Sequence, residues 1–163
     1  MLPALVVVLH VLSVFALVTG LVGRGICHAR ARRAEDLATV RVAMGLSNVF
    51  DFTLVRPVSL FVLLTGLAAA WARGWPILGI LQRAPINWVL AALLIYLTII
   101  PLIVFVFLPR ARVFEQALAE ASAQGAVTPA LRAALDDPVV RAARVYEMVM
   151  IAVLTWLMVA KPF

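Results

Sequence analysis

The sequence predicts an all-α protein, a bundle of four transmembrane helices with short amphipathic helices in its cytoplasmic loops. Of its 163 residues, 65% are apolar and 13% are charged, and the mean hydropathy is +1.09. A soluble domain carries roughly 45–50% apolar and about 25% charged residues. The apolar residues also gather in four long stretches, each close to the roughly 20 residues that a helix needs to cross a bilayer. We therefore expect residues 1–163 to form a single integral membrane domain.

The first apolar stretch predicts a transmembrane helix over residues 2–23, because no charged residue interrupts it before Arg24. It lacks the basic start of a secretory signal and exceeds the signal core of about 7–15 residues, so we expect this helix to be retained. Residues 34–50 predict an amphipathic helix at the membrane surface, since their apolar side chains recur at helical spacing. His28 lies between the two segments and is predicted to be a solvated loop residue.

The second and third transmembrane helices are predicted over residues 53–71 and 87–108. Arg56-Pro57 lies at the head of the second helix, where proline is tolerated because first-turn amides lack intrahelical partners. Pro101 lies inside the third helix and predicts a kink. Tryptophans cluster around the short loop between these helices, which is typical of an aromatic belt at the lipid headgroups. They are Trp71, Trp75 and Trp88.

The longest loop, residues 109–137, carries its own helix signals. Gly125 is a typical helix stop. Thr128 and Asp137 each precede a proline, which is the pattern of an N-cap residue followed by Pro at the first helical position. The sequence therefore predicts ordered helices in this loop and a fourth transmembrane helix over residues 144–160.

Basic residues are distributed unequally between the two sides of the membrane, and this asymmetry predicts the orientation. Cytoplasmic loops are enriched in Lys and Arg. We expect a multi-pass protein of the bacterial inner (plasma) membrane, with both chain ends outside the cytoplasm. The net charge of +6 then reflects topology, and we expect no nucleic-acid partner. The predicted cytoplasmic residues are Arg24, Arg30, Arg32, Arg33, Arg41, Arg110, Arg112, Arg132, Arg141 and Arg144, against Arg73, Arg83 and Lys161 outside.

His10 is the candidate ligand-binding residue. It lies about eight residues into the first helix, roughly 12 Å along the helix axis. Ionisable groups at such a depth are functional candidates by default, and neutral imidazole is a good ligand for haem iron or copper. Three interpretations stay open: a packing histidine that hydrogen-bonds to Ser13, Thr65 or Tyr96, a ligand of haem or a metal ion, or a group that exchanges protons.

Asp51, Arg56 and Glu147 form a second candidate set, near the predicted cytoplasmic boundary. They could build a gate or a proton path. Alternatively, they are interfacial charge pairs that fix the second helix against the fourth. Small residues predict close helix packing as well, because Gly20 and Gly66 belong to small-xxx-small pairs.

Three short motifs stand out along the chain: Leu9-His10-Val11-Leu12 with Gly20 and Arg24, Arg56-Pro57 with Gly66-Leu67, and Val159-Ala160-Lys161-Pro162-Phe163. The first two are similar to the first and second helices of HemJ-type protoporphyrinogen oxidases and copper-resistance-D-like proteins, and the third resembles the HemJ-type ending. Over the whole chain, the spacing is closer to a family of small four-helix predicted integral membrane proteins of unknown function.

The HemJ-type resemblance implies haem b as a cofactor, with His10 as its ligand. The third helix of that family carries His and Lys, whereas residues 87–93 of this chain contain neither type. We therefore do not predict an enzyme. The alternative function is that of a structural or accessory subunit. The expected partners are the lipid bilayer and either a second copy of the chain or a larger membrane complex.

The orientation can be tested by cysteine labelling. We expect Phe163→Cys, but not Ala123→Cys, to react with a membrane-impermeant thiol reagent in intact cells, because the basic loops should be cytoplasmic. The background is Cys27→Ala, which removes the single native cysteine. Labelling of Ala123→Cys from outside would contradict the predicted orientation.

Overall fold

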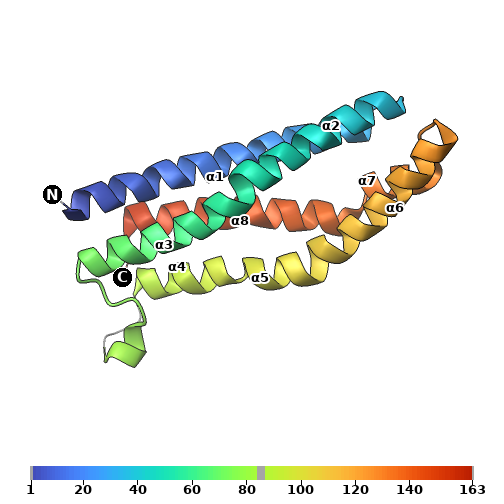
Figure 1. Ribbon diagram of the computed structural model, residues 1–163. Coiled ribbons are helices and arrows are strands. Elements are labelled where there is room, and N and C mark those ends of the chain that lie inside the picture. Colours follow the sequence, from blue (N-terminus) through green and yellow to red (C-terminus); the bar gives the residue numbers. More distant parts are fainter. Residues whose placement is uncertain (1, 84–86, 163) are drawn as a thin grey trace.

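The computed structural model describes residues 2–83 and 87–162, and Phe163 of the C-terminal motif lies outside these ranges. Four long helical rods, numbered here in chain order, run alternately in opposite directions, and the two chain termini lie at the same end (Figure 1). Within the described ranges, four helices are long and apolar enough to cross a membrane, which confirms the predicted fold class. The elements are α1 (Leu2–Arg33), α2 (Leu37–Phe50), η1 (Asp51–Val55), α3 (Arg56–Ala72), η2 (Gly79–Gln82), α4 (Trp88–Leu97), α5 (Ile99–Leu102), η3 (Ile103–Phe107), α6 (Leu108–Gln124), α7 (Pro129–Leu135) and α8 (Pro138–Ala160).

The first helix continues well beyond the predicted transmembrane segment. With 32 residues, α1 is about 48 Å long and exceeds the roughly 30 Å hydrocarbon core. Arginine is a good helix former, and Arg30, Arg32 and Arg33 favour the last turn through the helix dipole. The prediction that His28 is a solvated loop residue is therefore wrong, because it lies on α1 and hydrogen-bonds to Arg144.

The chain reverses after α1, and Asp36 starts the next helix. Its side chain accepts a hydrogen bond from the Thr39 backbone N–H at 2.7 Å, as an N-cap residue does. This hydrogen bond lowers the pKa of the Asp36 carboxyl, because it stabilises the charged form. The amphipathic helix predicted over residues 34–50 is present as α2.

Two short π-helices interrupt the second and third rods. In η1 the N–H of Arg56 bonds to the carbonyl of Asp51, and in η3 the N–H of Leu108 bonds to that of Ile103. A proline follows each π-helix by two residues, at positions 57 and 109. Proline lacks the amide hydrogen and its ring clashes with the carbonyl four residues earlier, so the preceding turn widens. Pro57 thus lies within a continuous rod and does not head an isolated helix.

The third rod is also interrupted where Pro101 predicts a kink. α4 ends at Leu97, Thr98 forms a turn, and α5 begins at Ile99. Leu97 is the residue whose carbonyl the Pro101 ring would meet in a regular helix. The rod therefore breaks one turn before the proline.

The helix signals of the longest loop are confirmed. Gly125 ends α6 in the left-handed conformation, with φ 71°. The Thr128 hydroxyl accepts the Leu131 N–H at the start of α7, and the Asp137 carboxylate accepts the N–H groups of Val139 and Val140 at the start of α8. α6 and α7 then pack with α2 and the end of α1 into an apolar cap around Val40, Ala121 and Leu131. We call this the cap end and the opposite one the termini end.

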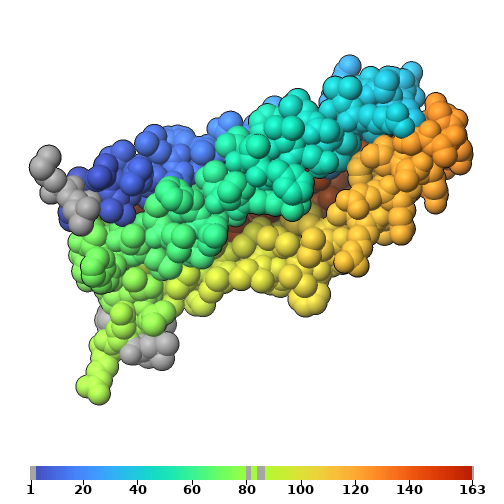
Figure 2. Space-filling model, viewed as in Figure 1, coloured from blue at the N-terminus to red at the C-terminus, as the bar shows by residue number. Residues whose placement is uncertain are grey.

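The rods form two hairpins that meet over a smaller area. α1 packs along α2, η1 and α3, whereas α4 packs along α8. The surface is hollowed between the teal segment near η1 and the yellow segment near η3, where α8 is visible beneath (Figure 2). Leu17 and Leu21 of α1 and Val62 of α3 form the core of the first hairpin and reach Tyr96 and Ile151 of the second.

Gly20 permits the close approach of α1 to η1, and this yields a test of helix packing. A Cβ atom at Gly20 would lie 2.8 Å from Leu54 Cβ and 3.3 Å from the Val55 backbone nitrogen. Gly20→Ala should lower the free energy of unfolding by about 1–3 kcal/mol through overpacking. Gly25→Ala is the matched control, because nothing lies within 4 Å of its Cβ position. Equal unfolding midpoints of the two variants in detergent would contradict this packing.

Candidate functional site

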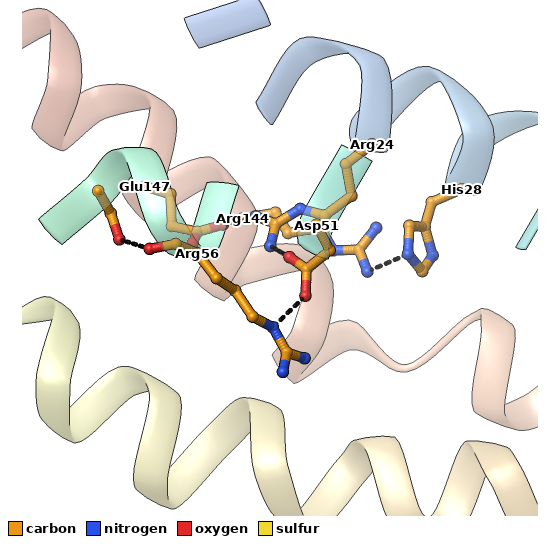
Figure 3. Close-up of polar contacts among 7 residues, drawn as sticks. Arg24, His28, Asp51, Arg56, Arg144 and Glu147 are labelled. Atoms are coloured by element: carbon orange, nitrogen blue, oxygen red, sulfur yellow. Dashed lines mark hydrogen bonds and ion pairs between the residues drawn. The ribbon is translucent and has the colours of Figure 1, made fainter. Parts of the chain in front are cut away.

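A cluster of charged side chains joins the two hairpins near the π-helices (Figure 3). Arg24 of α1 donates one hydrogen bond to Asp51 at 3.0 Å and another to Glu147 of α8 at 2.5 Å. Arg56 donates to the other oxygen of Asp51 at 2.8 Å. Arg24 thus bridges an acid of its own hairpin and an acid of the other. We call Arg24, Asp51, Arg56 and Glu147 the Arg24 cluster.

The centre of the Arg24 cluster is shielded from its surroundings. The side chains of Arg24 and Glu147 are 13% and 6% exposed. The Arg24 guanidinium also lies over the ring of Phe107, with 5.7 Å from Cζ to the ring centroid. Since Asp51 begins η1 and Phe107 ends η3, both π-helices contribute to the surroundings of one arginine. π-Turns inside α-helices occur frequently at functional sites.

A second polar contact lies beside this cluster. Arg144 of α8 donates from Nη2 to His28 Nε2 of α1 at 2.7 Å. A guanidinium only donates, so Nε2 of His28 must carry no proton. Arg144 Nε is buried and has no hydrogen-bond partner within the described part of the chain. Two arginines, one from each hairpin, therefore reach across the same interface.

The structure brings the predicted residues Asp51, Arg56 and Glu147 into this one region. Arg24 is the shared partner of Asp51 and Glu147, and Arg56 pairs with Asp51. The sequence pattern placed Arg24 at the membrane boundary and in the family motif, and it did not predict these pairs. The sequence feature that pointed to Arg24 was its position at the end of a charge-free apolar helix. An arginine there can snorkel to the headgroups or pair inside the bundle, and the sequence pattern is the same in both cases.

His10 lies on α1 in the half of the bundle near the termini, away from the Arg24 cluster. It is 9% exposed, and its Nδ1 lies 3.2 Å from the Thr65 hydroxyl of α3. Of its three predicted partners, Ser13 instead bonds to the carbonyl of Leu9, and the Tyr96 hydroxyl bonds to that of Ser59. The ring packs on Gly66, where an added Cβ would meet Cε1 at 3.0 Å.

The hydrogen bonds of Thr65 fix the tautomer of His10. The Thr65 hydroxyl donates its proton to the carbonyl of Phe61 at 2.7 Å, so it accepts from Nδ1–H. A charged imidazole is costly in apolar surroundings, and the neutral ring then has an unprotonated Nε2. No hydrogen bond involves Nε2 among the described residues. Metal-binding histidines are typically oriented in this way, through a hydrogen bond from the other ring nitrogen.

His10 lines a cavity of about 330 Å³ between α1, α3, α4 and α8. Aliphatic side chains of all four helices form most of its wall. The termini end of the cavity is polar, because Arg73 and Lys161 line it beside Trp75 and Trp88. Ligand sites are usually apolar hollows with a few convergent polar groups, at about 300–1,000 Å³.

The donor set of this cavity does not suit a bare metal ion. No group of three or more His, Cys, Asp or Glu side chains gathers anywhere in residues 2–83 and 87–162. Copper and iron ions in proteins typically take several such ligands. His10 can supply one nitrogen ligand, together with a large apolar contact surface.

Comparison with known proteins identifies a family and no individual relative. The family model described as "Predicted integral membrane protein (DUF2269)" matches residues 4–162. Comparisons with curated proteins and with solved structures find no match. The match covers nearly the whole chain and agrees with the four apolar helices: this is an integral membrane protein with four transmembrane helices.

The stability of the bundle should depend on Arg24. Arg24→Gln leaves Glu147 buried without its ion pair, and breaking a buried pair in this way costs about 3–5 kcal/mol. The control is Arg32→Gln, which breaks the more exposed pair with Asp136 and should cost about 0–1 kcal/mol. Unfolding curves in mild detergent measure both changes. A loss for Arg24→Gln no larger than for Arg32→Gln would show that the Arg24 cluster does not hold the hairpins together.

Proposed function

We propose that this chain, which belongs to the DUF2269 family of predicted integral membrane proteins, binds haem b in the cavity between its hairpins, with His10 as an axial ligand. The observation that carries the proposal is the orientation of His10. Its Nδ1 is held by Thr65, and its unprotonated Nε2 belongs to a side chain in the wall of an apolar cavity. This is the arrangement of a histidine ligand that binds through one ring nitrogen and is oriented by a hydrogen bond at the other.

Haem suits this donor set better than an iron or copper ion does. The macrocycle brings four nitrogen ligands of its own, so the protein needs to supply only axial ones. His10 provides one. Met158 also lines the cavity, and methionine thioether is an established type of axial haem ligand.

The shape and polarity of the cavity also favour a flat apolar ring. A macrocycle is about as wide as a helix, and this cavity lies between helices of two different hairpins. Aliphatic side chains would contact the ring faces, and burying them provides binding energy without further polar contacts. At about 330 Å³ the space is near the lower limit for ligand pockets. The helices around the cavity would therefore have to move apart as the ligand enters.

The resemblance to HemJ-type proteins supports the same assignment, since their first-helix histidine corresponds to His10. It does not extend to catalysis, because residues 87–93 lack the His and Lys of the third helix in that family. We therefore propose a haem-binding membrane protein and not an oxidase. Bound haem b would supply one-electron chemistry, and the chain itself would orient the ligand and exclude water.

The proposal predicts that His10→Ala removes the haem. Protein purified in mild detergent from haem-replete cells should show a Soret band, which His10→Ala should lose while still inserting in the membrane. His28→Ala is the control, because His28 bonds to Arg144 outside the cavity and should leave the band unchanged. Thr65→Val should keep the band but weaken haem binding by about 10–100-fold, as expected for a residue that orients a ligand.

Two results would overturn this assignment. Purified wild-type protein with no Soret band, and with no iron or copper by elemental analysis, would leave His10 as a packing residue. Stoichiometric recovery of another membrane protein would then support the alternative, a structural or accessory subunit. A haem band that persists in His10→Ala would instead place the ligand elsewhere.

A further inference from the structure

We infer that Arg73 and Lys161 form a carboxylate-binding site at the termini end of the His10 cavity, which receives the acid groups of the ligand. The inference rests on the proposed haem binding. It specifies which part of the ligand lies at each end of the cavity. An apolar cavity with two cations at one end suits an amphiphile, with an apolar body inside and anionic groups at that end.

The two cations come from different helices and converge on the same aromatic pair. Arg73 follows α3 and Lys161 follows α8, yet both line the cavity. The Arg73 guanidinium lies 5.5 Å from the Trp75 ring centroid, and Lys161 Nζ lies 4.9 Å from the same centroid. Trp75 and Trp88 pack edge to face, with centroids 5.0 Å apart. The rings hold both cations beside the cavity by cation–π attraction.

Within residues 2–83 and 87–162, no acidic side chain is positioned to neutralise these cations. Neither Arg73 nor Lys161 takes part in an ion pair among the described residues. The segments that build the termini end, residues 2–23, 60–83, 87–97 and 148–161, contain no Asp or Glu. All eight acidic residues belong to the cap, its connections or the Arg24 cluster. They are Glu35, Asp36, Asp51, Glu115, Glu120, Asp136, Asp137 and Glu147.

The backbone at Lys161 indicates that its side chain has a role beyond ending α8. Lys161 is the C-cap residue and adopts φ 44° and ψ 58°, a left-handed conformation that glycine adopts most easily. Helix termination alone would favour Gly or Asn at this position. The chain instead has a lysine there, whose ammonium lies over both tryptophans.

Carboxylates match this pair of cations. Guanidinium binds a carboxylate through two parallel N–H···O hydrogen bonds, and ammonium adds a mobile point charge. Haem b carries two propionate groups on one edge of the macrocycle. With that edge at Arg73 and Lys161, the remaining apolar edges would face the aliphatic wall.

The experiment compares haem with its dimethyl ester, in which both propionates are blocked. Each is titrated into ligand-free protein in the same detergent, and absorbance gives the dissociation constant. Wild-type protein should prefer haem over the ester by about ten- to a hundredfold, the ratio expected for charge-assisted hydrogen bonds. The double variant Arg73→Gln, Lys161→Gln should lose this preference and bind the ester as the wild type does. Arg83→Gln, an exposed cation in the loop between α3 and α4, is the matched control and should keep it.

The outcomes separate this inference from the haem proposal itself. If wild-type protein binds haem and ester equally well through His10, the haem proposal stands and the carboxylate site is overturned. A preference for haem that persists in the double variant overturns it as well. If wild-type protein binds neither compound, the haem proposal fails, and the carboxylate site fails with it.

Discussion

The ion pairs of Arg24 are the buried charge interaction that sets how the two hairpins align inside the bundle. Apolar helix surfaces in a membrane can slide past each other at little cost, because lipid tails are as apolar as the side chains they replace. A guanidinium bonded to Asp51 and Glu147 at 2.5–3.0 Å cannot slide without leaving buried charges unpaired. Arg24 therefore fixes the position of α8 along α1. It thereby also aligns the walls of the cavity that the two hairpins form together.

The His10 cavity is the feature that this alignment serves. His10 and Arg24 are fourteen residues apart on α1, which is about 21 Å and nearly four helical turns, so they share one face of the helix. Gly66 lets the His10 ring sit close to α3, while α4 and α8 supply the opposite wall. The ion pairs of the Arg24 cluster and the His10 cavity thus lie at different levels of the bundle. The wall of the cavity is mostly aliphatic, and its charged residues are confined to the termini end.

Local features were predictable from the sequence, and long-range pairings were not. The caps at Thr128, Asp137 and Gly125 follow from chemistry within four residues, so the local sequence pattern determines their structure. Arg24 was assigned to the membrane boundary, because its partners lie 27 and 123 residues away. The depth of His10 was evident from its place in the helix, but the choice between its partners depended on how α3 packs against α1. Pro57 matched a helix start, since the same proline suits a first turn and the end of a π-helix.

The π-helix η1 restricts the changes in length that the second rod can tolerate. Each residue of an α-helix turns the following chain by about 100°, so the wider turn at Asp51–Val55 offsets the phase of α2 from that of α3. The apolar face of α2 points into the cap and that of α3 points into the bundle. Deletion of one residue here would shorten the rod by only about 1.5 Å. It would also rotate Val40 and Met44 away from the cap core. The rotation of α2 about its axis is therefore set by the cap, and that of α3 by the bundle.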